Sequence, residues 1–174
     1  MKQIVLVFIS LLLLSCAEQA ARRPVSKASG SFMKESIERN KKIIKEEEEL
    51  IAQVISKDSR NKYISTPYGF WMSYLIKKDE ELSLANKGDK IIYSKEVTDL
   101  NGNEIYPSKT FEYFTDQQEI IIGLRNGLKL LKEGEKARFM FTSQQAYGYI
   151  GDHDKIGINT PISVTITIDK IIEK

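Results

Sequence analysis

The stretch Leu124–Phe141, LRNGLKLLKEGEKARFMF, predicts a short helix that leads directly into a strand. Leucines in its first half recur at i, i+4 and i+7, which is typical of one apolar face of a helix. Gly134 follows just past that face, where a glycine commonly ends a helix. From Lys136 to Phe141 apolar and other residues alternate, which is the period of a strand with one buried face. The leucines of the helix are Leu124, Leu128 and Leu131.

The residues on both sides of this stretch have the character of β-strands. The aromatic run Tyr68–Ile76 and the segments Lys90–Thr98 and Lys109–Thr115 predict strands, and Asn101–Gly102 predicts a hairpin turn. From Ile162 to Ile168 apolar and hydroxyl residues alternate, so this segment is a further strand with one buried face. A mostly antiparallel sheet with one short helix packed across it is an α+β arrangement.

The N-terminal segment, residues 1–15, is typical of a secretory signal. A lysine precedes an apolar run that is shorter than the roughly 20 residues needed to span a bilayer as a helix. Leu13–Cys16, LLSC, resembles the bacterial lipobox, which implies cleavage before Cys16 and acylation of its thiol. A plain signal peptide with an incidental cysteine is the alternative. The lipoprotein is favoured because the only cysteine of the chain stands at the position that a lipobox requires.

Residues 16–30 are small and polar and are predicted to form a tether. Residues 31–60 follow, and within them Phe32–Ile55 has the spacing of an amphipathic helix. The charge run Lys45–Glu49 is interpreted as a solvated face of this helix. The apolar stripe packs either on the following domain or on the same helix of a second copy. The homodimer is favoured, because a tether and a polar segment flank the helix. The residues of the stripe are Met33, Ile37, Ile44, Ile51 and Ile55.

Composition and motifs exclude several classes of function. The 26 Lys and Arg nearly balance the 24 Asp and Glu, and this gives no basic face for nucleic acid. One cysteine and one histidine exclude a disulfide within the chain and argue against zinc, which takes about four such ligands. Asp152–Asp154 is interpreted as a solvated loop, and Asp99–Asn103 as a hairpin turn that lacks the spacing of a calcium loop. We expect neither a metal nor another cofactor.

Four segments of the second half of the chain form a specific combination: Gln118–Leu128 (QEIIIGLRNGL), Leu131–Arg138 (LKEGEKAR), Ala146–Gly148 (AYG) and the run Ile156–Val164 before the last strand. Through these segments the sequence from about Gly88 to Ile168 resembles FKBP-type peptidyl-prolyl isomerases. A further motif, Thr66–Trp71 (TPYGFW), is most similar, together with the lipobox and the helical leader, to the gliding-motility-associated lipoprotein branch of this family.

The resemblance implies a half-barrel sheet wrapped on a short helix over residues 63–174, with a shallow apolar pocket that accepts a proline ring. Glu119 would lie at the pocket rim and offer a backbone carbonyl, and the loop at Asp152–Asp154 would overhang the pocket. Lys95 replaces a frequent tyrosine, and Ile105–Tyr106 replaces a frequent Phe-Asp pair. Leu124 stands where the family usually has a tryptophan floor, and Val164 where a phenylalanine wall is common. Carried over position by position, the residues that line the pocket would be Phe111, Ile120, Ile121, Leu124, Tyr147, Ile156 and Val164.

The function that the resemblance implies is isomerisation of X-Pro bonds in exported envelope proteins, with Tyr147 as the catalytic hydrogen-bond donor. The partners would be proline-containing polypeptides and, through acylated Cys16, a membrane of the cell envelope that faces the periplasm, inner or outer. Service to a gliding-motility or secretion apparatus is one interpretation. Two alternatives stay open. A chaperone that binds proline segments without catalysis fits the changes at Leu124, Val164 and Lys95. A structural lipoprotein would dock an envelope assembly through its helix.

Overall fold

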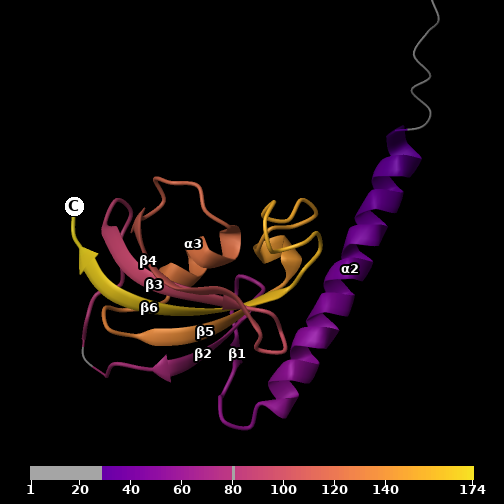
Figure 1. Ribbon diagram of the computed structural model, residues 1–174. Coiled ribbons are helices and arrows are strands. Elements are labelled where there is room, and N and C mark those ends of the chain that lie inside the picture. The colour runs from indigo at the N-terminus through magenta and orange to yellow at the C-terminus, as the bar shows by residue number, and fades with distance from the viewer. Residues whose placement is uncertain (1–28, 80) are drawn as a thin grey trace, which may run out of the picture. The chain divides into compact units, whose positions relative to one another are not determined.

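The computed structural model describes residues 29–79 and 81–174 (Figure 1). The predicted signal sequence, the lipobox with Cys16 and nearly all of the predicted tether lie outside the described residues. The chain divides into two compact units, Met1–Ser36 and Ile37–Lys174. Helix α2 (Ser29–Lys57) begins in the first unit, and the strands described below all lie in the second.

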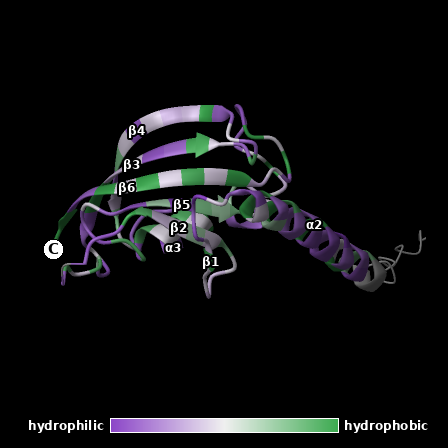
Figure 2. Ribbon diagram, turned by 90° about the horizontal axis from the view of Figure 1, so that it is seen from below, coloured by the Kyte–Doolittle hydropathy of each residue, from purple (hydrophilic) through white to green (hydrophobic). Residues whose placement is uncertain are grey.

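A six-stranded antiparallel sheet, in the order β1-β2-β5-β6-β3-β4, forms the body of the second unit. The short helix α3 (Ile122–Leu128) lies inside the curve of this sheet (Figures 1 and 2). This arrangement confirms the predicted α+β fold of the FKBP type. The strands are β1 (Ile64–Ser65), β2 (Trp71–Ile76), β3 (Lys90–Thr98), β4 (Glu104–Phe114), β5 (Lys136–Phe141) and β6 (Ile162–Ile172).

The strand predicted at Tyr68–Ile76 begins only at Trp71, because a turn takes up its first residues. The N–H and the hydroxyl of Thr66 both donate to the carbonyl oxygen of Phe70, over 2.9 and 2.8 Å. Gly69 has a positive φ of 79°, which a glycine adopts at little cost. The turn therefore ends in a buried Phe70, from which β2 continues.

The hydrophobic core lies between the concave face of the sheet and α3. From Ile162 to Ile168 in β6, apolar and hydroxyl residues alternate, as the green and pale bands in Figure 2 show, and the apolar ones are buried. The rings of Phe70, Phe139 and Phe141 pack together with centroids 5.1–5.8 Å apart. Leu124 and Leu128 of α3 join this core. Burial of apolar surface on α3 and on the concave face of the sheet therefore holds the helix against the sheet.

Helix α2 buries only part of its predicted apolar stripe. Ile51 is fully buried, whereas Met33 and Ile37 stay 65% and 51% exposed. The charge run was predicted to be solvated, and this is wrong for Glu47, which is only 4% exposed. Glu47 stands three residues after Ile44 and four before Ile51, so it shares their face of the helix. Among the described residues, no helix is long and apolar enough to cross a membrane.

Candidate functional site

A cavity of about 350 Å³ opens at one end of β3 and β4, beside the segment that follows the 3₁₀ turn η2 (Ser143–Gln145). This volume is in the range of small-ligand pockets, about 300–1,000 Å³. Two of the predicted site residues, Phe111 and Tyr147, line it. The complete lining is Lys95, Val97, Tyr106, Pro107, Lys109, Phe111, Tyr147 and Asp152.

The other predicted site residues lie in or near the adjoining core. Ile120 and Ile121 are half-buried and pack against the core cluster. Glu119, just before them, is exposed and is not among the residues that line the cavity, so its position at the rim stays a prediction. The remaining three are buried members of the core rather than part of the cavity lining: Leu124, Ile156 and Val164.

Tyr147 is held by the backbone of its own loop. The N–H of Gly148 donates to the carbonyl oxygen of Ser143 over 2.7 Å, and the N–H of Gly151 donates to that of Tyr147 over 3.2 Å. Within the part of the chain that the structure describes, the Tyr147 hydroxyl makes no hydrogen bond. Burial, and next the charge of Asp152, raises the pKa of Tyr147. The phenol therefore stays protonated at neutral pH and is free to donate to a bound molecule.

Tyr106 and Asp152 form a polar edge of the cavity that the sequence did not reveal as a pair. The Tyr106 hydroxyl donates to Asp152 Oδ2 over 2.5 Å, and this bond, with burial next in importance, raises the pKa of Tyr106 to about 12. Asp152 Oδ1 also accepts the N–H groups of Asp154 and Ile156, over 2.9 and 2.8 Å. Burial alone would raise the pKa of Asp152, but these three hydrogen bonds outweigh it and lower the pKa.

Phe111 forms the aromatic wall of the cavity. Its ring stacks on that of buried Tyr93, with centroids 5.7 Å apart. The ammonium groups of Lys95 and Lys109 lie 4.7 and 5.9 Å from the centre of the same ring. Pro107 is tolerated in β4 because this is the outermost strand and its register with β3 shifts there.

The sequence between residues 82 and 168, half of the chain, matches the model of a family described as FKBP-type peptidyl-prolyl cis-trans isomerase. The chain belongs to this family. It is accordingly an FKBP-type isomerase, and the family implies proline-containing polypeptides as its substrates. The match covers the segments that form the cavity, from Lys95 to Asp152. Strands β1 and β2 precede the match and extend the same sheet.

A solved structure supports the fold of this FKBP-type isomerase. The chain is similar to a peptidyl-prolyl cis-trans isomerase from Pseudomonas syringae pv. tomato, with a TM-score of 0.62 and 20% sequence identity. The similarity covers 76% of this chain and 96% of that one. Comparison with curated proteins gives no match.

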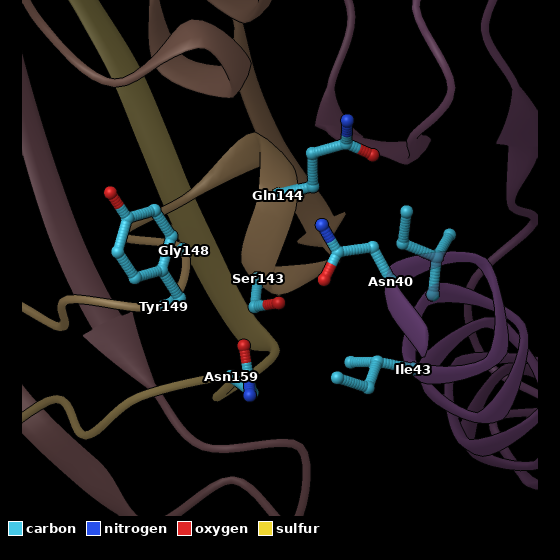
Figure 3. A pocket seen from close by; sticks show the side chains of 8 residues that line it. Asn40, Ile43, Ser143, Gln144, Gly148, Tyr149 and Asn159 are labelled. Carbon is cyan, nitrogen blue, oxygen red and sulfur yellow. The ribbon is translucent and has the colours of Figure 1, made fainter. Parts of the chain in front are cut away.

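A smaller cavity of about 110 Å³ lies between α2 and the segment that carries Ser143 and Tyr149 (Figure 3). Ile43 and Ile44 of α2 line one side of it, and Ser143 and Tyr149 line the other. Its lining includes no residue of the larger cavity, so the two cavities are separate. Because both α2 and the loop contribute residues to it, we interpret it as a gap where the two segments meet. No group of three or more histidine, cysteine or acidic side chains in residues 29–79 and 81–174 is arranged to hold a metal ion.

Proposed function

We propose that the cavity beside Phe111 and Tyr147 holds the proline ring of the substrate while its X-Pro bond rotates. The observation that carries this proposal is the Tyr147 hydroxyl, a protonated donor at an aromatic wall with no hydrogen-bond partner among the described residues. No covalent bond is broken in the reaction, so the site needs no acid, base or metal. The bond rotates over a barrier of about 18–20 kcal/mol because rotation removes the amide resonance.

The apolar wall favours the twisted state over the planar one. A planar amide has a large dipole that water solvates well, and twisting reduces that dipole. Moving the amide from water to the side of Phe111 and Val97 therefore costs the planar state more free energy than the twisted one. Such differential binding lowers the barrier, because only interactions stronger in the transition state accelerate a reaction.

Tyr147 adds a smaller contribution by donating a hydrogen bond to the substrate carbonyl. A hydrogen bond of this kind contributes about 0.5–1.5 kcal/mol net, which is roughly tenfold in rate or less. The pocket walls must therefore supply most of the acceleration.

A protease-coupled isomerisation assay on a proline tetrapeptide tests the proposal. We expect the purified protein to accelerate the cis-to-trans reaction well above its uncatalysed rate, which takes tens to hundreds of seconds. A rate equal to that of the buffer control would contradict catalysis. It would leave a chaperone that binds proline segments, an alternative that the changes at Leu124, Val164 and Lys95 favour.

We further propose that acylated Cys16 anchors the isomerase in the cell envelope, where it acts on exported proteins from the side that faces the periplasm. The lipobox resemblance of Leu13–Cys16 and the position of the only cysteine support this anchor. Mass spectrometry of the mature protein should find acyl chains on residue 16, and Cys16→Ser should release the protein from the membrane fraction. A mature N-terminus downstream of Cys16 without acyl groups would contradict the anchor.

A gliding-motility or secretion apparatus is the proposed client of this anchored isomerase. The similarity of Thr66–Trp71 and the helical leader to the gliding-motility-associated branch supports it. In the producing bacterium, Tyr147→Phe and a deletion should slow gliding or secretion in the same direction, with the deletion stronger. A deletion strain that glides and secretes at the parental rate would contradict the assignment.

The first half of α2 supports the proposed homodimer. Phe32, Met33 and Ile37 stay 66%, 65% and 51% exposed, although an apolar stripe on a helix is usually covered. A Met33→Asp, Ile37→Asp double change should convert a dimer to a monomer in sedimentation equilibrium. A monomeric parent protein across micromolar concentrations would contradict the dimer. The same stripe would serve a structural lipoprotein, and pull-down of a different envelope protein by the parent but not by the variant would favour that alternative.

A further inference from the structure

Two lysines stand directly opposite each other at the cavity. Lys95 on β3 pairs with Lys109 on β4 in the antiparallel register, and both line the cavity. Opposite residues of an antiparallel pair point to the same face, with Cβ atoms about 4.5–5.5 Å apart, and like charges at such positions destabilise the sheet. This repulsion therefore lies at the place where the substrate is proposed to bind.

Neither ammonium group is neutralised by the described part of the chain. The salt bridges within residues 29–79 and 81–174 involve other cations. Both ammonium groups instead lie over the ring of Phe111, the wall of the cavity, at 4.7 and 5.9 Å from its centre. Lys95 is half-buried, and burial lowers its pKa, as expected for a cation that has lost water without gaining a partner.

The other charged groups at the cavity do not cancel this charge. Asp152 is the carboxylate in the lining, and its single negative charge, held by neutral donors from Tyr106, Asp154 and Ile156, offsets only one of the two ammonium charges. Asp154 accepts a second, longer contact from Tyr106, over 3.1 Å. Lys155 adds a further cation 5.2 Å from the Tyr106 ring, and its ammonium donates to the carbonyl oxygen of Ile105. The net charge of the cavity lining is therefore positive.

We propose that the Lys95–Lys109 pair makes this isomerase select prolines whose neighbouring residue carries an anionic side chain. The inference rests on the proposed function, because it takes the cavity to hold the substrate's proline ring. An anion beside that proline would lie near both ammonium groups, relieve their repulsion and accept charge-assisted hydrogen bonds. A carboxylate and a phosphate share this chemistry, and peptides can distinguish them.

The test measures isomerisation and binding by the full chain on peptides that differ only in the residue next to proline. Glutamate is compared with its neutral isostere glutamine, with lysine and with phosphoserine, placed before proline in one series and after it in another. We expect kcat/KM for the glutamate peptide to exceed that for glutamine by about fivefold in the favoured series, the equivalent of about 1 kcal/mol. The preference should shrink in high salt, which screens charges. The phosphoserine peptide shows which of the two anions is preferred.

Variants assign the preference to the two lysines. In a Lys95→Met, Lys109→Met double variant the glutamate-to-glutamine ratio should fall to about one, and Lys95→Glu should favour the lysine peptide. Lys170→Met removes an equal charge from an exposed position on β6 and should leave the ratio unchanged. The single Lys95→Met and Lys109→Met variants should unfold at the parental temperature or above it, because each removes a repulsion. Unfolding temperatures in this range would show that the variants keep the fold.

The outcomes separate this inference from the proposed function. Equal kcat/KM for glutamate and glutamine peptides in both series, or a ratio that survives in the double variant, would overturn the inference and leave the isomerase. Selective binding of anionic peptides without acceleration would support the selection and overturn the proposed catalysis. Failure of every peptide to bind would overturn both.

Discussion

Glu47 of helix α2 accepts two hydrogen bonds from Ser143, one from its N–H and one from its hydroxyl, each 2.7 Å long. Both residues are buried. The carbonyl oxygen of Ser143 in turn accepts the N–H groups of Ala146 and Gly148, on either side of Tyr147 in the sequence. The leader helix therefore supports the start of the loop that carries the proposed catalytic tyrosine.

Glu47→Ala should destabilise the protein by about 2–3 kcal/mol, because the buried N–H of Ser143 loses a charged acceptor. Chemical denaturation measures this change. Glu46→Ala is the matched control: Glu46 is exposed, lies 3.7 Å from Lys42 and should change stability by less than about 0.5 kcal/mol. Equal stabilities of the two variants would contradict a supporting role for Glu47.

Tyr147→Phe should lower kcat/KM by roughly tenfold or less and leave the unfolding temperature nearly unchanged. The small effect on stability follows because the hydroxyl has no hydrogen-bond partner in the described part of the chain. Tyr149→Phe, two residues on and 78% exposed, is the control and should change neither quantity. A complete loss of activity in Tyr147→Phe would mean that the walls contribute little.

Asp152→Asn should reduce stability at neutral pH but not in acid. The hydrogen bonds to Asp152 lower its pKa in the folded state despite the opposing effect of burial. A lowered carboxyl pKa stabilises the fold above the unfolded pKa of about 3.9, and this contribution is lost as pH falls through the folded pKa. The difference between parent and variant should therefore be full at pH 7 and shrink below about pH 4.

The same substitution should lower the pKa of Tyr106 from about 12, since its bond to Asp152 is the main reason for the raised value. Ultraviolet titration of the phenols measures this shift. Asp79→Asn, an exposed position, serves as the control. An unchanged phenol titration in Asp152→Asn would show that the two side chains are not joined in solution.

Gly123→Ala should destabilise the protein and slow catalysis, because α3 packs closely under the loop. A Cβ at this position would lie 2.8 Å from the ring of Phe141 and 2.9 Å from the carbonyl oxygen of Gln145. Gly157→Ala is the control, since its nearest contact would be an ordinary 3.5 Å. Differential scanning calorimetry should show a lower unfolding temperature for the first variant alone. Equal unfolding temperatures would show that Phe141 and the loop at Gln145 can shift to make room for the methyl group without a loss of stability.

Much of the fold follows from local patterns in the sequence. The β character of Lys90–Thr98 and the alternation at Lys136–Phe141 predict β3 and β5 with the bounds that the structure has. Strand β4 begins at Glu104, five residues before the predicted start at Lys109. The sequence did not predict this first half, because it carries Pro107 and no clear alternation. A strand of this kind forms through its pairing with β3, which no short window of sequence contains.

The family pattern predicted only part of the cavity lining, and contacts between distant segments supply the rest. Of the residues that the resemblance placed at a pocket, Phe111 and Tyr147 line this cavity, and its role as the proline site stays a prediction. The Tyr106–Asp152 bond joins residues far apart in the chain, so no local pattern announces it. Glu47 looked like one charge among several, and only its phase between Ile44 and Ile51 could have indicated burial. The Lys95–Lys109 pair needed the register of β3 and β4.

The central claim, that an apolar wall lowers the rotation barrier, is tested most directly by kcat/KM for Phe111→Leu and Phe111→Asn on one proline tetrapeptide, with thermal unfolding as the check on folding. Leucine keeps the wall apolar, and we expect activity within a few-fold of the parent. Asparagine makes the wall polar, and we expect a loss of more than about tenfold, greater than that of Tyr147→Phe. A folded Phe111→Asn variant as active as the parent would contradict the account.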